Sequence, residues 1–193
     1  MTEAATRSPA AAPGTVGWEV RPGRTEDAPA LAVAVAALLG ELGGTPPARA
    51  AIEAEARAHI EDPSLGIVLV AAAEADDPQG SSSQKLPHSD QNCELAGDGG
   101  GLVGVLTASW ARAIQVAGRL LTIEVLWTER EWRDRGVGAA LVDALAAAAA
   151  AEGAGRVEVG LPRESFPALR ATERFYLANG FERLGPRMRR AVP

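Results

Sequence analysis

The chain has 193 residues and a formal net charge of −6, from 19 basic and 25 acidic side chains. This length suits one domain with a sizeable core. The acidic balance disfavours a general nucleic-acid or anionic-membrane binder, which would carry a basic stripe. The single cysteine, Cys93, excludes an internal disulfide and suits a reducing compartment. No signal peptide or bilayer-spanning run is visible, so a soluble, cytoplasmic protein is expected.

The first part of the chain predicts a tail, a strand and two helices. Residues 1–16 are rich in Ala, Pro, Thr and Gly, which indicates a disordered tail ahead of a domain spanning 17–193. A short strand is expected at 18–21. Asp27 is positioned to cap the first helix, and a second helix is expected from about 47 to 60.

The middle of the chain combines a strand with an unusual polar segment. Residues 65–73 form a continuous apolar run of strand length. Residues 74–100 contain Asp-Asp-Pro, Ser-Ser-Ser and Gly-Asp-Gly-Gly, a composition that indicates a disordered hairpin-loop insertion. Within it, His88 and Cys93 have a spacing that fits no standard metal site, so no metal is expected.

The second half of the chain alternates strands with helices. A helix between two strand-like runs predicts a parallel, right-handed crossover. The arginines of the closing segment are interpreted as the solvated face of edge strands, or less favourably as a dock for an acidic acceptor. The expected elements are strands at 102–110, 121–128 and 156–160, a hairpin connection at 111–119, helices at 136–152 and 167–179, and closing strands at 181–184 and 187–192.

The stretch 133–139, Arg-Asp-Arg-Gly-Val-Gly-Ala, lies where the strand gives way to the helix. Its two glycines allow the backbone to approach a ligand closely, and the first helical turn supplies unpaired N–H groups. These groups and the positive helix end make an anion site, to which Arg133 and Arg135 add charge. Asp134 could instead cap the helix. The stretch therefore predicts a phosphate cradle.

Two nucleotide-binding motifs fit this cradle poorly. A mononucleotide P-loop requires Gly-Lys-Ser/Thr, and Ala139 follows Gly138 here. A dinucleotide fingerprint requires a third glycine, where this chain has Leu141, and a turn directly after the strand. Residues 128–135 intervene, so both interpretations weaken.

The remaining pattern, Arg-x-x-Gly-x-Gly after a strand and a charged connector, resembles the pyrophosphate loop of the GNAT superfamily of acyl-CoA-dependent N-acyltransferases. The segment Trp18–Pro22, followed by Asp27, is similar to the family's first strand and helix start. Residues 171–181, with Phe175-Tyr176 and a closing Gly-Phe, resemble its late helix. The resemblance implies an α/β (α+β) fold with a mixed, mostly antiparallel sheet of about six to seven strands flanked by helices. A splayed parallel strand pair would bind acetyl-CoA.

The resemblance also implies the cofactor contacts. The exposed strand backbone at 126–128 would bond to the pantetheine amides, and an N–H near Leu126 would polarise the thioester carbonyl. The diphosphate would rest on the amides from 135 to 139. Simple core packing is an equally weighted role for the Trp127 side chain. The residues assigned to acetyl-CoA are Leu126, Trp127, Thr128, Arg133, Asp134, Arg135, Gly136, Val137, Gly138, Ala139 and Phe175.

Two side chains are candidates for acid–base chemistry. Glu124 is the only acidic residue in an apolar strand, two residues before Leu126 and so on the same face of a regular strand. It would act as base or amine ligand, with structural pairing to an arginine as the alternative. Tyr176, the only tyrosine, occupies the family's general-acid position; the alternative is packing beside the thioester.

These observations lead to a functional hypothesis. An N-acetyltransferase would pass the acetyl group of acetyl-CoA directly to a primary amine of a small molecule (aminoglycoside-like, polyamine or amino acid) or of a protein. The alternative is a non-catalytic acyl-CoA-binding module. No nucleic-acid or membrane partner is expected, and a homodimer is compatible with the sequence.

Overall fold

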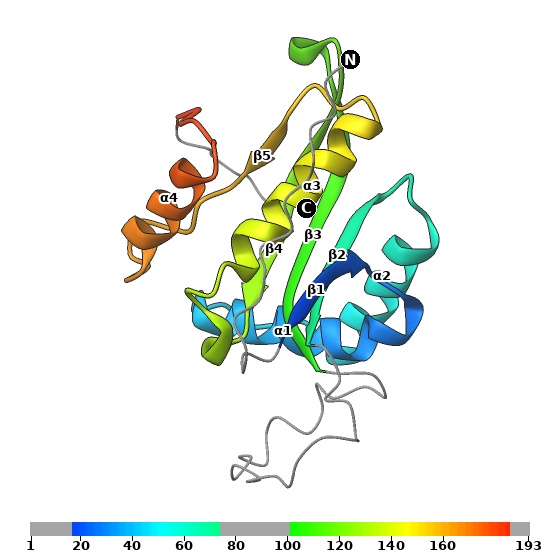
Figure 1. Ribbon diagram of the computed structural model, residues 1–193, viewed down its shortest axis with the longest axis vertical. Coiled ribbons are helices and arrows are strands. Elements are labelled where there is room, and N and C mark those ends of the chain that lie inside the picture. Colours follow the sequence, from blue (N-terminus) through cyan, green and yellow to red (C-terminus); the bar gives the residue numbers. More distant parts are fainter. Residues whose placement is uncertain (1–16, 74–100, 186–193) are drawn as a thin grey trace, which may run out of the picture.

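The computed structural model describes residues 17–73 and 101–185. They form a five-stranded sheet whose strands lie side by side in chain order, antiparallel except for the last pair (Figure 1). The expected tail at 1–16, insertion at 74–100 and strand at 187–192 lie outside these residues. The strands are β1 (Trp18–Pro22), β2 (Gly66–Ala73), β3 (Leu102–Ala113), β4 (Gly118–Thr128) and β5 (Val157–Val159), and the helices are α1 (Ala28–Glu41), α2 (Arg49–Glu61), α3 (Val137–Ala151) and α4 (Leu169–Ala178).

Helices cover both faces of the sheet, with α3 and α4 on one face and α1 and α2 on the other (Figure 1). Two hydrophobic clusters fill these layers: the α3 core lies between the sheet and α3, and the α1 core lies between the sheet and α1. Successive β2 side chains alternate between them, because Leu69 and Ala71 belong to the α3 core and Val68 and Val70 to the α1 core. Because both faces are covered, β2 reads as a continuous apolar run. No helix among the described residues is long and apolar enough to cross a bilayer.

The close approach of α3 to the sheet depends on Gly104 in β3. A Cβ at this position would lie 2.7 Å from Val137 Cγ1 and 3.0 Å from Leu141 Cδ1. Both of these side chains are fully buried in the α3 core. The first turns of α3 therefore rest directly on the β3 backbone, beside Thr128, the register partner of Gly104 at the end of β4.

Asp27 does not cap α1 with its side chain, so that prediction was wrong. Its buried carboxylate accepts hydrogen bonds from Arg21 Nη1 and Nη2, at 2.7 and 2.9 Å, and from the Arg24 backbone N–H at 2.7 Å. Burial alone would raise the pKa of Asp27, but these hydrogen bonds and the Arg21 charge outweigh it and lower the pKa. The Arg21 guanidinium thus binds the Asp27 carboxylate that was expected to accept hydrogen bonds from the amides of α1.

The expected strand at 181–184 is not formed. The Phe181 N–H instead donates to Tyr176 O at 3.0 Å, and Gly180 has a φ of 82°. This six-to-one hydrogen bond with a left-handed glycine is the Schellman ending of a helix. Arg183 is correspondingly not on an edge strand; its Nε donates to Glu173 Oε1 at 2.6 Å.

Candidate functional site

A cavity of about 530 Å³ lies where β4 and β5 separate. The parallel pairing of these strands ends at Ile123 and Val159, while β4 continues to Thr128. After β5 the chain turns away through Gly160 and Pro162. The splayed pair that the sequence resemblance implied is therefore present, and its gap is the cavity.

The β4 backbone presents hydrogen-bonding groups to this gap. Glu129 N donates to Val103 O at 2.9 Å, which fixes which residues face β3. Because the direction of backbone groups alternates along an antiparallel strand, those of Trp127 face β3 and those of Leu126 and Thr128 face away from it. The Leu126 N–H and C=O lie beyond the last β5 partner of β4 and are available to a ligand.

The amino end of α3 forms a second wall with backbone donors. Gly136 precedes the helix with a φ of 83°, and no side chain caps the helix. Asp134 has a φ of 60° and makes no capping bond, so the cap interpretation of Asp134 was wrong. The first intrahelical hydrogen bond runs from Ala140 N to Gly136 O at 3.0 Å. The cavity-lining turn thus offers uncapped amides at the positive end of the helix.

The second glycine of the motif has a different structural reason from the first. A Cβ on Gly136 would meet nothing within 4 Å, so its positive φ is what requires glycine. A Cβ on Gly138 would lie 3.3 Å from Phe175 Cζ on α4. The absence of a side chain at Gly138 lets the Phe175 ring close the cavity against the first turn of α3.

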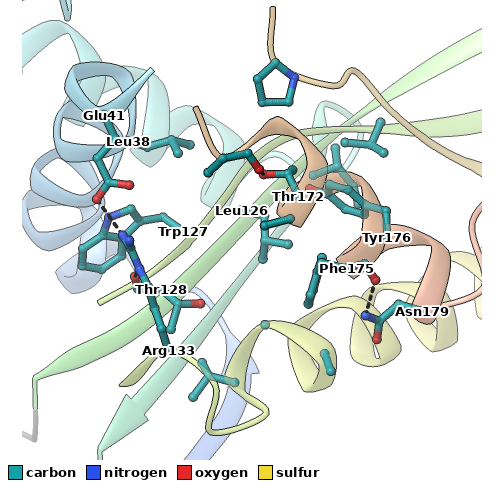
Figure 2. Close-up of a pocket in the computed structure, with 18 of the residues that line it drawn as sticks. Leu38, Glu41, Leu126, Trp127, Thr128, Arg133, Thr172, Phe175, Tyr176 and Asn179 are labelled. Atoms are coloured by element: carbon teal, nitrogen blue, oxygen red, sulfur yellow. Dashed lines mark hydrogen bonds and ion pairs between the residues drawn. The ribbon is translucent and has the colours of Figure 1, made fainter. Parts of the chain in front are cut away.

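The two arginines of the motif lie differently. Arg133 lines the cavity; its Nε donates to Thr128 O at 3.1 Å and its Nη2 to Glu41 Oε1 at 2.6 Å. Figure 2 shows this ion pair beside the Trp127 indole. Arg135 does not line the cavity; its guanidinium lies 5.2 Å from the centre of the Trp132 ring, where a cation–π interaction holds it.

Tyr176 lines the cavity from α4 and is buried. Its ring makes edge-to-face contacts with Phe175 and Phe181, each with centroids 5.2 Å apart. Burial raises the pKa of Tyr176 to about 12, because the phenolate would lose its hydration. The hydroxyl consequently keeps its proton across the physiological range and can donate a hydrogen bond.

Glu124 also lines the cavity, and its side chain is exposed. The register shifts at this point: Thr107 pairs with Val125 and Ala108 with Ile123, which leaves Glu124 as the extra residue of a β-bulge. Ile123 and Leu126 accordingly pack with the α3 core, while Val125 and Trp127 pack with the α1 core. Because the bulge breaks the alternation, the face of Glu124 no longer follows from that of Leu126, and the expectation that they share a face stays a prediction. No described residue forms an ion pair with Glu124.

Trp127 is both core and cavity wall. Its side chain is 7% exposed and packs with the α1 core, yet it also lines the cavity. Its indole Nε1 is buried and has no hydrogen-bond partner among the described residues. The core role of the Trp127 side chain fits the structure, whereas the backbone groups of Trp127 face β3 and do not fit the expected contact with the pantetheine arm.

One cavity thus gathers almost all of the candidate residues, from positions 124 to 176 of the chain. Arg135 alone stays outside its wall. Sequence reasoning missed the carboxyl end of α1, because nothing local marks a pairing between residues 92 positions apart. It also missed the residues of the β5–α4 connection and the other residues on the face of α4 that lines the cavity. The missed lining residues are Leu38, Glu41, Leu42, Ile123, Trp132, Val159, Gly160, Pro162, Phe166, Ala168, Ala171, Thr172 and Asn179.

Comparisons with known proteins agree with this geometry. A family profile described as "Acetyltransferase (GNAT) domain" matches residues 89–183, whereas no curated protein sequence matches the chain. A possible acetyltransferase from Clostridium difficile 630 superposes with a TM-score of 0.66 at 15% identity, covering 91% of this chain and 98% of its own. The aminoglycoside N-acetyltransferase AAC(6')-Iy in complex with CoA gives 0.67 at 13% identity, with 94% and 99% coverage. Glucosamine-6-phosphate N-acetyltransferase from Arabidopsis thaliana gives 0.61 at 13% identity, with 92% and 99% coverage.

Proposed function

We propose that this chain, which belongs to the GNAT superfamily of acetyltransferases, transfers the acetyl group of acetyl-CoA directly to a primary amine. One observation carries the proposal. The cavity between the splayed strands is bordered by uncapped helix amides at one end, an open strand backbone in the middle and a buried tyrosine opposite. These are the donors that a diphosphate, a pantetheine arm and a thioester each require.

Binding follows from these donors. The diphosphate lies on the first-turn amides of α3, because aligned N–H groups and the helix dipole favour an anion there. The pantetheine arm continues along β4 and bonds to the backbone of Leu126 as an added strand would. The Leu126 N–H then faces the thioester oxygen as its negative charge develops.

The acceptor has to reach the thioester as a free amine. With an ordinary pKa of about 10.4, about one lysine-like amine in a few thousand is neutral at pH 7, a handicap of about 4–5 kcal/mol. Glu124, exposed on the cavity wall at the β-bulge, attracts the ammonium ion and accepts a proton from it directly or through water. The amine nitrogen attacks the carbonyl carbon and loses a second proton to solvent, and the carbon–sulfur bond breaks.

Tyr176 assists the leaving sulfur as a hydrogen-bond donor. Its pKa of about 12 lies well above the value of about 8.5 for a thiol. Complete proton transfer to a free thiolate is therefore uphill. Tyr176 stabilises the charge that develops on sulfur and keeps its own proton, and the thiolate is protonated from solvent after release.

The charge of the cavity wall supports a cationic acceptor. Glu41, Glu124 and Asp134 line the cavity against a single basic residue, Arg133, so a cationic amine fits better than a phosphorylated one. The aminoglycoside acetyltransferase among the structural neighbours makes aminoglycosides a first choice, ahead of polyamines, amino acids and peptide amino termini.

A thiol-release screen tests the proposed reaction. Acetyl-CoA is offered with amines of each class, and acetylated product is identified by mass spectrometry. We expect release that depends on a cationic amine. Binding of acetyl-CoA without release by any amine class would instead favour a non-catalytic acyl-CoA-binding module.

The variant Tyr176→Phe tests the role of the hydroxyl. We expect kcat to fall at least roughly tenfold while the calorimetric Kd for CoA is unchanged. Phe181→Leu is the matched control, because it loosens packing around the same ring and leaves the hydroxyl in place. Equal turnover by Tyr176→Phe and the unaltered protein would remove Tyr176 from the mechanism.

A further inference from the structure

The carboxyl end of α1 contacts the phosphate cradle through one ion pair. Glu41, the last residue of α1, accepts a hydrogen bond from Arg133 Nη2 at 2.6 Å. Arg133 is also held by Thr128 O through its Nε, so its guanidinium lies between the end of β4 and the end of α1. In Figure 2 the pair spans the cavity wall beside the Trp127 indole.

This pair is a poor stability device. Its side chains are 41% and 44% exposed, and exposed ion pairs contribute little to folding because water screens them. Glu41 also stands at the negative end of the α1 dipole, where a carboxylate is unfavourable. The helix dipole thus opposes a carboxylate at this position and the screened ion pair stabilises it only weakly, and Arg133 is the only partner that the described residues offer it.

The location of Arg133 gives the pair a different consequence. The guanidinium belongs to the turn that leads into the uncapped amides of α3, and both line one cavity. A diphosphate bound on those amides brings two negative charges towards Arg133, and guanidinium groups bind phosphate oxygens strongly. Glu41 already holds the donor that such an anion would use.

We propose that Glu41 and the cofactor diphosphate compete for Arg133, so that Glu41 sets the affinity of the site for CoA. This inference rests on the proposed function. On binding, the diphosphate replaces the carboxylate as the partner of Nη2, while Nε keeps its bond to Thr128 O. In this exchange Glu41 is a positioning residue, because it acts on the cofactor through Arg133 and does not touch the cofactor itself.

The test is isothermal calorimetry with CoA and with pantetheine, which lacks the diphosphate. We expect Glu41→Gln to tighten CoA binding about 1.5-fold to fivefold, the range that an exposed ion pair allows, and to leave pantetheine binding unchanged. High salt should shrink the difference, because the pair is screened. Glu61→Gln is the matched control, since Glu61 is the exposed last residue of α2. This substitution changes the net charge by the same amount and also removes a carboxylate from the negative end of a helix dipole.

A double-mutant cycle isolates the competition. Arg133→Gln should weaken CoA binding, and Glu41→Gln should have no further effect in that background. An unchanged or weaker affinity for CoA in Glu41→Gln would overturn the proposal. Equal tightening of pantetheine would also overturn it, because it would indicate a wider cavity rather than a charge exchange. No CoA binding by the unaltered protein or any variant would overturn the proposed function as well.

Discussion

Helix α1 is bracketed by two arginine–carboxylate pairs that have the same chemistry and different surroundings. Before its first residue, Asp27 receives two hydrogen bonds from Arg21, and the side chains are only 8% and 19% exposed. At its last residue, Glu41 receives one from Arg133, with both side chains about half exposed. Removing one partner of a buried pair leaves an uncompensated charge, whereas an exposed pair exchanges partners readily. The ion pair at the start of α1 is therefore permanent, whereas the ion pair at its end can exchange its partner.

The largest effect that this comparison predicts is on stability. Asp27→Asn should lower the free energy of unfolding by about 3 kcal/mol, because the Arg21 guanidinium loses its buried counterion. Glu41→Gln, the same change at the other end of the helix, should alter it by less than about 1 kcal/mol. Urea unfolding at pH 7 measures both variants. Similar losses for both would contradict the distinction between the two ends.

Acid pH sharpens the same prediction. Because the folded-state pKa of Asp27 is lowered, its contribution is complete above the ordinary value of about 3.9 and is lost as pH falls through the lowered value. Unfolding curves between pH 2 and about 5 should thus be less steep in pH for Asp27→Asn than for the unaltered protein. An acid dependence that runs parallel in the two proteins would argue against this assignment.

The next prediction concerns Tyr176 in the α4 wall of the cavity, where burial keeps the hydroxyl neutral. Tyr176 is the only tyrosine, so the ultraviolet absorbance of tyrosinate reports on it alone. We expect a midpoint of about 12 in the folded protein, against an ordinary value of 10.0. A raised pKa stabilises the fold fully below the ordinary value, and this contribution is lost as pH rises through the folded value; two pKa units correspond to about 3 kcal/mol.

Two controls accompany this titration. Circular dichroism recorded on the same samples shows whether the protein is still folded at each pH, and Tyr176→Phe should lack the absorbance change. A midpoint near 10 in protein that is still folded would show that the hydroxyl is well hydrated and would weaken its proposed role.

The smallest predicted effect is on stability at Gly136, and it tests whether backbone strain or lack of room for a side chain requires glycine in the turn before α3. Gly136→Ala should destabilise the protein by about 1 kcal/mol, because the residue keeps a φ of 83° that a side chain disfavours. Gly160→Ala is the matched control: it also has open space around its Cβ, without the positive φ. Thermal unfolding of the two variants compares them, and equal melting temperatures would show that the turn relaxes without strain.

The order and type of the elements could be predicted from the sequence because they depend on local patterns. The apolar run of β2, the alanine-rich α3 and the Gly-x-Gly turn each carry their signal within a short window. The separation of β4 from β5 was implied by a resemblance, and the sheet topology agrees with it.

The differences from the sequence predictions have two physical sources. At Glu124 a single inserted residue shifts the alternation of β4, and periodicity has no means of locating a bulge. At Asp27 and Glu41 an arginine elsewhere in the chain takes the carboxylate, a competition that local propensity omits. The strand expected after α4 failed for a related reason, because the Phe181 amide is already used to end the helix.

Gly104 lies outside the cavity but determines the position of α3 relative to the sheet. A missing methyl group on β3 determines how closely α3 rests on the sheet, and hence the span between the amides of its first turn and the free backbone of β4. Changes at this position would alter the distance between the two halves of the proposed cofactor site while every group that touches the cofactor stayed the same. Because the distance from diphosphate to thioester is the same in every acyl-CoA, such a change would affect the binding of all acyl donors alike.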